Sequence, residues 1–165
     1  MKLSAQEEYG LRCLLQVARH PATSITIGEL SRLEGISSPN VAKIMRLLRR
    51  GGFVKSIRGQ AGGYALARGA EEIMVGEVLA FLGGRLFDST FCERHAGIEA
   101  LCTHLGDCSI RPVLRQLQGA IDQVLDRLTL SGLLCTEREM AARTGGRGVS
   151  LPVLASSPLD QTPRR

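Results

Sequence analysis

The sequence lacks any long uninterrupted apolar stretch. No apolar run approaches the roughly 18 residues that a membrane-spanning helix needs, although 44% of the residues are hydrophobic, an ordinary share for a globular protein. The first residues, MKLSAQEEYGLRCLL, carry two Glu and one Arg, without the apolar core or small-residue cleavage site of a signal peptide. We therefore expect a cytoplasmic protein with no membrane partner, in a compartment that keeps thiols reduced.

The sequence also lacks the residue patterns of common enzymes. It contains no Ser-His-Asp set and no glycine-rich phosphate loop in strand-to-helix context, so we expect neither catalysis nor a small-molecule substrate. The odd number of cysteines, five, argues against a disulfide-stapled secreted scaffold. Cys13 lies within an apolar helical stretch and Cys135 at a helix end, and both are expected to be packing residues.

Positive charge is concentrated in the first part of the chain. The net charge is +5, but residues 1–70 contain 11 Lys and Arg against 4 Asp and Glu, whereas residues 71–165 contain 10 against 12. A basic N-terminal half indicates a polyanionic partner. A solvated face that is merely basic would have the same composition, so charge alone leaves both interpretations open.

Periodicity in the first part of the chain predicts three helices and a hairpin. Helices are expected from Ser4 to His20 and from Ile27 to Glu34. The segment SSPNVAKIMRLLRRGGF predicts a third helix, with Ser37 or Ser38 as its N-cap and Pro39 in its first turn. FVKSIRGQAGGYALA alternates apolar residues around a glycine-rich tip, as β-hairpins do. This order predicts a mainly α fold with a small β-wing, a winged helix-turn-helix domain over residues 1–80.

Basic residues coincide with the two elements that would contact double-stranded DNA. A recognition helix brings its N-terminal residues to base edges in the major groove. There Asn40 can bond bidentately to adenine and Lys43 to guanine, while Arg58 at the hairpin tip suits a narrow minor groove. The candidate contacts are Ser37, Ser38, Pro39, Asn40, Lys43, Arg46, Arg49, Arg50, Lys55, Arg58, Gly59 and Arg68.

The second half predicts two further helices. EEIMVGEVLAFLGG reads as an amphipathic helix, and a longer one is expected over residues 110–135, where apolar residues alternate at steps of four and three. Such a seam favours packing on a second copy of the chain; the alternative is packing on the chain's own N-terminal helices. Residues 136–165, rich in Gly, Ser, Pro and Arg, predict a disordered tail. The dimerisation stripe consists of Ile110, Leu114, Leu117, Ile121, Val124 and Leu128.

Three cysteines, Cys92, Cys102 and Cys108, fall in a polar segment, residues 81–109, that is expected to be a loop. Nine and then five residues separate them, unlike the CxxC pairs of a zinc ribbon. Three thiolates on one loop can hold an iron–sulfur cluster, because clusters take Cys ligands readily and tolerate one substitute. Together with His95 the three would instead form a Cys₃His zinc site. Two close thiols would suffice for a reversible disulfide switch.

Over roughly residues 1–135 the chain resembles the Rrf-type winged-helix regulators of bacteria. The likeness is carried by MKLS…EYGLRCLLQVA, TIGELSRLEGISSPNVAKIMRLLRRGGFV, the wing SIRGQAGGYALAR, the later VGEVLAFL, and three cysteines before a long helix. The resemblance implies a homodimeric transcription factor, usually a repressor, that inserts Arg58 into the minor groove. Two-fold symmetry implies a palindromic operator. In that family three cysteines at this position hold a [2Fe-2S] or [4Fe-4S] cluster, whose state sets the affinity for DNA.

The resemblance leaves the fourth cluster ligand open. The family's iron–sulfur assembly regulator has five residues between its first two cysteines, and its histidine ligand falls at Arg111 here, which cannot serve because it stays protonated. Another arrangement in the family uses an acidic residue at the eighth position of the partner subunit, which is Glu8 here. A carboxylate binds iron weakly. The iron bound by Glu8 would therefore be the first to react with nitric oxide or oxygen, and the first to be lost when iron is scarce. The alternative is a solvated Glu8.

We therefore expect a homodimeric DNA-binding transcriptional regulator, controlled by an iron–sulfur cluster on the three loop cysteines and sensing nitric oxide, iron or cluster status, or redox state. One alternative is a DNA-binding regulator without a cluster, stabilised by zinc or switched by thiol–disulfide chemistry. Another is a metal-binding adaptor for protein interactions, whose binding would be insensitive to salt, whereas DNA binding weakens steeply as salt rises.

Overall fold

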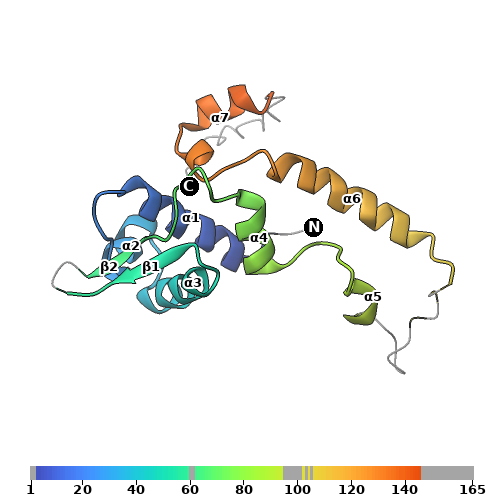
Figure 1. The fold of residues 1–165 in the computed structure, drawn as a ribbon, viewed down its shortest axis with the longest axis horizontal. Coiled ribbons are helices and arrows are strands. Elements are labelled where there is room, and N and C mark those ends of the chain that lie inside the picture. The colour runs from blue at the N-terminus through green and yellow to red at the C-terminus, as the bar shows by residue number, and fades with distance from the viewer. Residues whose placement is uncertain (1–2, 60–61, 95–101, 103, 105, 146–165) are drawn as a thin grey trace, which may run out of the picture. The chain divides into compact units, whose positions relative to one another are not determined.

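The computed structural model describes residues 3–59, 62–94, 102, 104 and 106–145 (Figure 1). The chain divides into two compact units, residues 1–134 and 135–165. The first unit has the predicted mainly helical architecture with one two-stranded antiparallel hairpin, which confirms the winged-helix fold class. Its elements are α1 (Ala5–Arg19), α2 (Ile27–Glu34), α3 (Ser38–Arg50), β1 (Val54–Ile57), β2 (Gly63–Leu66), α4 (Val75–Gly83), α5 (Phe91–Arg94), α6 (Ile110–Leu125) and a 3₁₀ turn (Ser131–Leu133).

The first two helices begin where their sequences supply a capping box. In α1 the Ser4 side chain accepts from the Glu7 backbone N–H, and the Glu7 carboxylate accepts from the Ser4 N–H at 2.8 Å. Thr26 and Glu29 do the same for α2. These bonds satisfy N–H groups that a helix start leaves without intrahelical partners.

The third helix starts at the predicted position but lacks a side-chain cap. Ser37 occupies the N-cap position of α3, but its side chain forms no capping bond. The Ser38 hydroxyl instead donates to the Ser31 hydroxyl of α2, at 3.2 Å. Pro39 lies in the first turn, as expected, because its missing N–H costs nothing there. Ser37 is therefore the N-cap residue, as predicted, but without a side-chain capping bond, and both serine side chains stay exposed.

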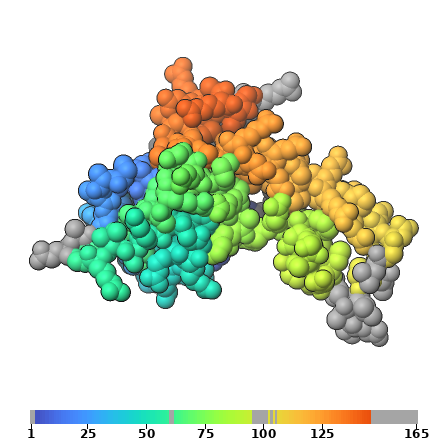
Figure 2. All heavy atoms as spheres, in the orientation of Figure 1, coloured from blue at the N-terminus to red at the C-terminus, as the bar shows by residue number. Residues whose placement is uncertain are grey.

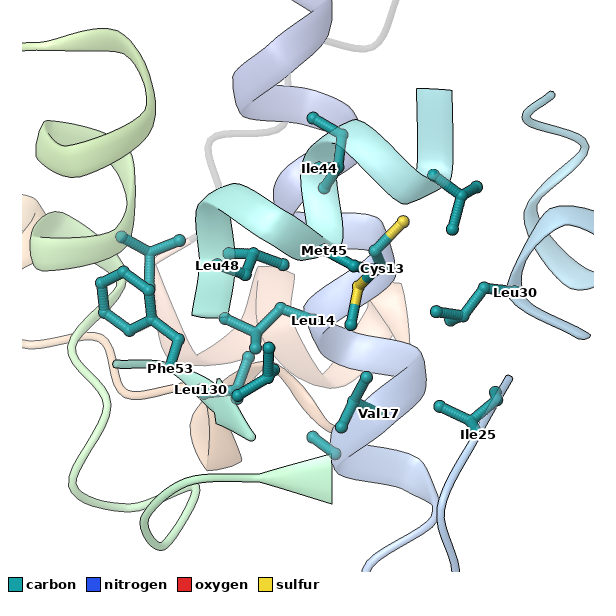
Figure 3. Packing of buried hydrophobic residues seen from close by; sticks show 14 of the residues in the cluster. Cys13, Leu14, Val17, Ile25, Leu30, Ile44, Met45, Leu48, Phe53 and Leu130 are labelled. Carbon is teal, nitrogen blue, oxygen red and sulfur yellow. The ribbon is translucent and has the colours of Figure 1, made fainter. Parts of the chain in front are cut away.

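One hydrophobic core joins helices α1 to α4 and the hairpin (Figure 3). Cys13 of α1 is fully buried within it, which confirms its packing role, and burial raises the pKa of its thiol to about 11. Gly10 allows α1 to approach α4 closely, because a Cβ at this position would overlap Leu82. The labelled side chains that converge here are Cys13, Leu14, Val17, Ile25, Leu30, Ile44, Met45, Leu48, Phe53 and Leu130.

The hairpin also forms a β-bridge with Ile25, which lies just before α2. Strands β1 and β2 pair from Val54↔Leu66 to Ile57↔Gly63, as the alternation predicted. Ile25 and Tyr64 exchange two backbone hydrogen bonds, of 2.9 and 2.8 Å, which attach β2 to the segment before α2. Gly59 at the tip has φ = 110°, a conformation that residues with a Cβ rarely adopt. The segment before α2 is therefore attached to the part of β2 that is nearest the turn of the hairpin.

Two helix boundaries differ from the sequence prediction for one reason. Helix α4 begins at Val75 and not at residue 71, and α6 ends at Leu125 and does not continue to residue 135. The residues before α4 pair with those after α6, through Val75 N–H to the Leu128 carbonyl (2.9 Å) and Leu130 N–H to the Ile73 carbonyl (2.8 Å). Leu130 then enters the core, 1% exposed. Long-range backbone pairing thus overrides helical periodicity at both ends.

Two segments expected to be irregular contain helices. The predicted loop, residues 81–109, includes the end of α4 and the short helix α5. The second unit contains α7 (Glu137–Arg143), capped by Thr136, so the expected disorder does not hold for these residues. His95 and residues 146–165 lie outside the described residues. Across the described ranges we find no helix whose length and apolar character would suit it to span a membrane.

Candidate DNA-binding surface and cysteine segment

Helix α3 is held by one face and presents the other to solvent. Its buried side chains, Val41, Ile44, Met45 and Leu48, recur at steps of three and four and pack into the core. The outward face carries four Lys or Arg side chains and no carboxylate. The exposed residues on it are Ser38, Pro39, Asn40, Lys43, Arg46, Arg49 and Arg50.

An acid-free stretch extends from this helix into the wing. Between Glu34 and Glu71 the sequence contains seven Lys and Arg and neither Asp nor Glu. Six of these seven side chains are exposed, on α3, on β1 and at the wing tip. A surface with unopposed positive charge attracts the phosphates of nucleic acid and raises association rates. The six residues are Lys43, Arg46, Arg49, Arg50, Lys55 and Arg58.

The wing tip lies beside the start of α2. A cleft of about 590 Å³ runs between them, and Thr26, Gly28, Ser56 and Arg58 are among its lining residues. The Ile25–Tyr64 pairing brings the wing next to α2. Because this pairing is long-range, the local sequence around Thr26 and Gly28 did not predict the cleft. Residues 60 and 61 of the tip lie outside the described residues.

A set of polar contacts attaches the end of α2 to α1. Glu34, at the end of α2, accepts from Arg12 Nε at 2.7 Å and from Gln16 Nε2 at 2.5 Å. The hydrogen bond to Glu34 raises the pKa of the Arg12 guanidinium. Arg12 also reaches the exposed Glu8 carboxylate, at 3.4 Å. Glu8, Arg12 and Glu34 therefore form a chain of contacts from α1 to the end of α2.

Arg68 does not share the exposure of the other basic candidates. Its guanidinium donates to both carboxylate oxygens of Glu77 in α4, at 2.7 and 2.6 Å, and lies 5.8 Å from the centre of the Phe53 ring. The structure thus places Arg68 against α4, at the base of the wing.

Comparison with known proteins identifies the family of this fold and surface. Residues 3–136 match the family model Rrf2, described as an iron-dependent transcriptional regulator. The chain belongs to the Rrf2 family. Regulators of this family bind DNA, so this Rrf2 protein is a DNA-binding transcription regulator and not an enzyme.

Relatives of this Rrf2 protein agree with the assignment. It is 31% identical to the protein rrf2 of Nitratidesulfovibrio vulgaris over 140 residues, which cover 81% of this chain and 87% of that one. It is 32% identical to the HTH-type transcriptional regulator IscR of Vibrio atlanticus over 135 residues, 81% of this chain and 75% of that protein.

Solved structures show the same relationship. IscR of T. potens has a TM-score of 0.64 and 28% identity, covering 81% of this chain and 86% of that one. The oxidised form of Staphylococcus aureus CymR has a TM-score of 0.62 and 26% identity, covering 82% and 98%. The same fold therefore occurs in regulators named IscR and CymR.

The three candidate cysteines of this Rrf2 protein lie between α4 and α6. Cys92, in α5, and Cys102 and Cys108, before α6, are half-buried thiols outside any disulfide. Within the residues that the structure describes, no three His, Cys, Asp or Glu side chains gather closely enough to hold a metal ion. Cys92 lines a cleft of about 620 Å³, together with Arg111 and Arg115 of α6.

A buried glutamine attaches the start of this segment to α6. Gln118 is 8% exposed, and its Oε1 accepts from the Phe87 backbone N–H at 3.0 Å. Its Nε2 donates to Asp122 at 2.8 Å, and Asp122 also pairs with Arg85. Sequence analysis missed this contact, because a Gln in an amphipathic helix is expected on the solvent side.

The apolar stripe of α6 is largely uncovered. Figure 2 shows atoms of this helix, in yellow to orange, on the visible face. Ile110, Leu117 and Val124 are 62%, 49% and 60% exposed, and Val113, outside the predicted stripe, is 54% exposed. Leu114 and Ile121 are half-buried, and Leu128 lies beyond the end of the helix. An apolar face of this kind marks an interaction surface.

Proposed function

We propose that this protein is a homodimeric regulator whose affinity for an operator is controlled by an iron–sulfur cluster. The ligands are Cys92, Cys102 and Cys108, with Glu8 of the second protomer as the fourth. The signal is nitric oxide, iron or cluster status, or redox state, and the usual outcome is repression.

The observation that carries the DNA-binding part is the acid-free surface of α3 and the wing. Its six exposed cations follow both elements, and the core holds α3 by its opposite face, so the basic side chains are free to meet DNA. In this proposal Asn40 and Lys43 read bases and Arg58 enters the minor groove. Ser37, Ser38, Arg46, Arg49, Arg50 and Lys55 contact phosphates or bases nearby, and Pro39 and Gly59 shape the two contacting turns.

The chemistry of the cysteine donors fits an iron–sulfur cluster. All three thiols are half-buried and outside any disulfide, but in the part of the chain that the structure describes they do not gather into a group that could hold a metal ion. When bound, the cluster would supply a redox-active and nitric-oxide-sensitive group on the thiolates. The similarity to proteins named IscR supports this choice over zinc.

Homodimerisation is supported by the exposed stripe of α6. Burying Ile110, Leu117 and Val124 against a second copy would remove their apolar surface from water, the main driving force of association. Antiparallel or crossing α6 helices would also bring the two α3 helices into a two-fold arrangement, as a palindromic site requires.

Residues of this chain offer a route from the cluster to DNA. Glu8 is exposed on α1, and Arg12 contacts both Glu8 and Glu34. Because Glu34 ends the helix that precedes the recognition helix, a change in the position of Glu8 alters the support of α2 through Arg12. This route makes Glu8 the residue that reports the ligand state to the DNA-binding helices.

Anaerobic purification with iron, sulfide and zinc assays and a visible spectrum tests the proposal. We expect coloured protein with iron and sulfide, lost in Cys92→Ala, Cys102→Ala and Cys108→Ala and retained in Cys135→Ala. Glu8→Ala should keep the cluster under anaerobic conditions but lose it faster in air. Colourless protein, or zinc in stoichiometric amount, would contradict the cluster assignment and leave the DNA-binding assignment standing.

A thiol–disulfide switch is the second candidate. The three thiols are half-buried and outside any disulfide, and the chain is similar to a CymR structure described as an oxidised form. Under this alternative the protein is colourless, and an oxidant changes its affinity for DNA reversibly. Alanine at two of the three cysteines would remove that response.

A further inference from the structure

The base of the wing is attached to α4 at two points. Phe53, which precedes β1, is 1% exposed and meets the Phe81 ring of α4 edge-on, with centroids 5.7 Å apart. Arg68, which follows β2, meets Glu77 of α4 through both carboxylate oxygens. The Ala67 N–H donates to the Phe53 carbonyl at 3.0 Å and joins the two feet of the hairpin. Both strands of the wing therefore end on one helix.

The two attachments support each other. The Arg68 guanidinium lies over the Phe53 ring, 5.8 Å from its centroid, while the same group bonds Glu77. A planar guanidinium can stack on an aromatic face and bond a carboxylate in its own plane at once, which an ammonium cannot. The geometry uses the properties specific to Arg, and the Glu77 carboxylate balances its charge.

We propose that Arg68 is a positioning residue, which fixes the wing on α4 through Glu77 and Phe53 and so presents Arg58 to DNA. In this assignment Arg68 makes no phosphate contact of its own. The inference rests on the proposed role of Arg58 for its consequence at DNA, but its structural part concerns the free protein. Through these contacts α4, the helix that leads into the cysteine segment, is attached directly to the wing.

The salt dependence of DNA binding separates positioning from contact. The slope of log affinity against log salt falls by about 0.9 for each phosphate-type contact that is lost. A duplex selected from random-sequence DNA by the wild-type protein serves as the probe, at roughly 50 to 200 mM salt. Arg58→Met, Arg68→Met and the double variant are compared. If Arg68 positions Arg58, the double variant loses one contact per protomer; if Arg68 binds phosphate, it loses two.

Substitution of Glu77 provides a second test, because the positioning role and a phosphate contact predict opposite changes in the affinity for DNA. Positioning predicts that Glu77→Gln weakens binding as Arg68→Met does, by up to about fivefold, the range for an exposed ion pair. A phosphate contact predicts that Glu77→Gln releases Arg68 and strengthens binding. Glu71→Gln is the matched control, because it makes the same charge change at a neighbouring exposed position. Exchanging the two charges, with Arg68→Glu and Glu77→Arg together, should restore much of the affinity lost by either single variant.

Amide hydrogen exchange in the free protein tests the attachment without DNA. We expect faster exchange in β1 and β2 of Arg68→Met and Glu77→Gln, with α1 and α3 unchanged. Unchanged exchange in the wing, or a double-variant slope that falls by two contacts, would overturn the proposal. Should Arg58→Met leave the slope unaltered while exchange in the wing still rises, the positioning role holds and the proposed minor-groove contact fails.

Discussion

Helices α3 and α6 are both amphipathic, but they use their apolar residues in opposite ways. In α3 the apolar residues Val41, Ile44, Met45 and Leu48 are all buried by α1, α2 and the wing. In α6 the apolar residues Ile110, Val113, Leu117 and Val124 are exposed, and the one buried side chain of the helix is a glutamine.

The apolar face of α3 is covered within the same chain, whereas most of the apolar face of α6 is exposed to solvent. The N-terminal domain buries enough apolar surface to hold α3 in place, so its basic face is defined in a single chain. Helix α6 is attached by polar and backbone bonds at Gln118 and beyond Leu125, which direct it without covering its stripe. In the proposed homodimer, a second copy of the chain would cover this stripe.

Truncation in the core of α3 should have the largest effect on stability. Leu48→Ala removes a fully buried side chain and leaves a cavity, which costs about 2–5 kcal/mol of unfolding free energy. Urea unfolding followed by circular dichroism measures the loss. Leu33→Ala, at a position 56% exposed, is the control and should change stability by less than about 0.5 kcal/mol. Equal losses in the two variants would show that α3 is not held by this core.

Charges on the α6 stripe should break the proposed dimer without unfolding the N-terminal domain. Leu117→Glu combined with Val124→Glu places two carboxylates in the proposed interface, and should raise the dissociation constant by at least about thirtyfold. Sedimentation equilibrium measures it, and Gln116→Glu on the same helix is the control. A variant that stays dimeric would move the interface away from this stripe.

Removal of the Gln118 side-chain bonds tests the attachment of the cysteine segment. Gln118→Leu leaves the Phe87 N–H without its acceptor, a local cost of about 1–3 kcal/mol. Amide exchange at Phe87 should therefore become faster in metal-free protein, with α1 to α3 unaffected. Gln116→Leu, at an exposed position, should leave that exchange rate unchanged.

The smallest expected effect is the response of the core to alkaline pH. Burial raises the pKa of Cys13 from 9.0 to about 11, so the unfolded thiol loses its proton first as the pH rises. Stability is therefore retained below pH 9 and falls between about pH 9 and 11, by about 1.4 kcal/mol at pH 10. Urea unfolding at pH 8 and 10 under reducing, anaerobic conditions measures this decline. Cys13→Ala should show less of it than the wild type.

Local patterns predicted α1, α2 and α3 closely, because capping residues, a proline and glycines mark their ends. They failed at α4 and α6, whose boundaries depend on backbone pairing between Ile73–Val75 and Leu128–Leu130, far apart in the sequence. They also could not show that Arg68, a predicted DNA contact, pairs with Glu77 of α4, because that pairing depends on tertiary structure. No local sequence pattern indicated that Gln118 of α6 would be buried and bonded to Phe87.

The amino-acid sequence by itself determined the order of helices and hairpin, the acid-free basic stretch and the clustering of three cysteines before α6. These follow from local periodicity, turn chemistry and composition, which act over a few residues. Only the tertiary structure decided which basic side chains face outward, which apolar stripe is left uncovered and which polar group anchors the cysteine segment. Those outcomes depend on contacts between residues distant in the chain, where packing selects one of several arrangements that the local sequence allows.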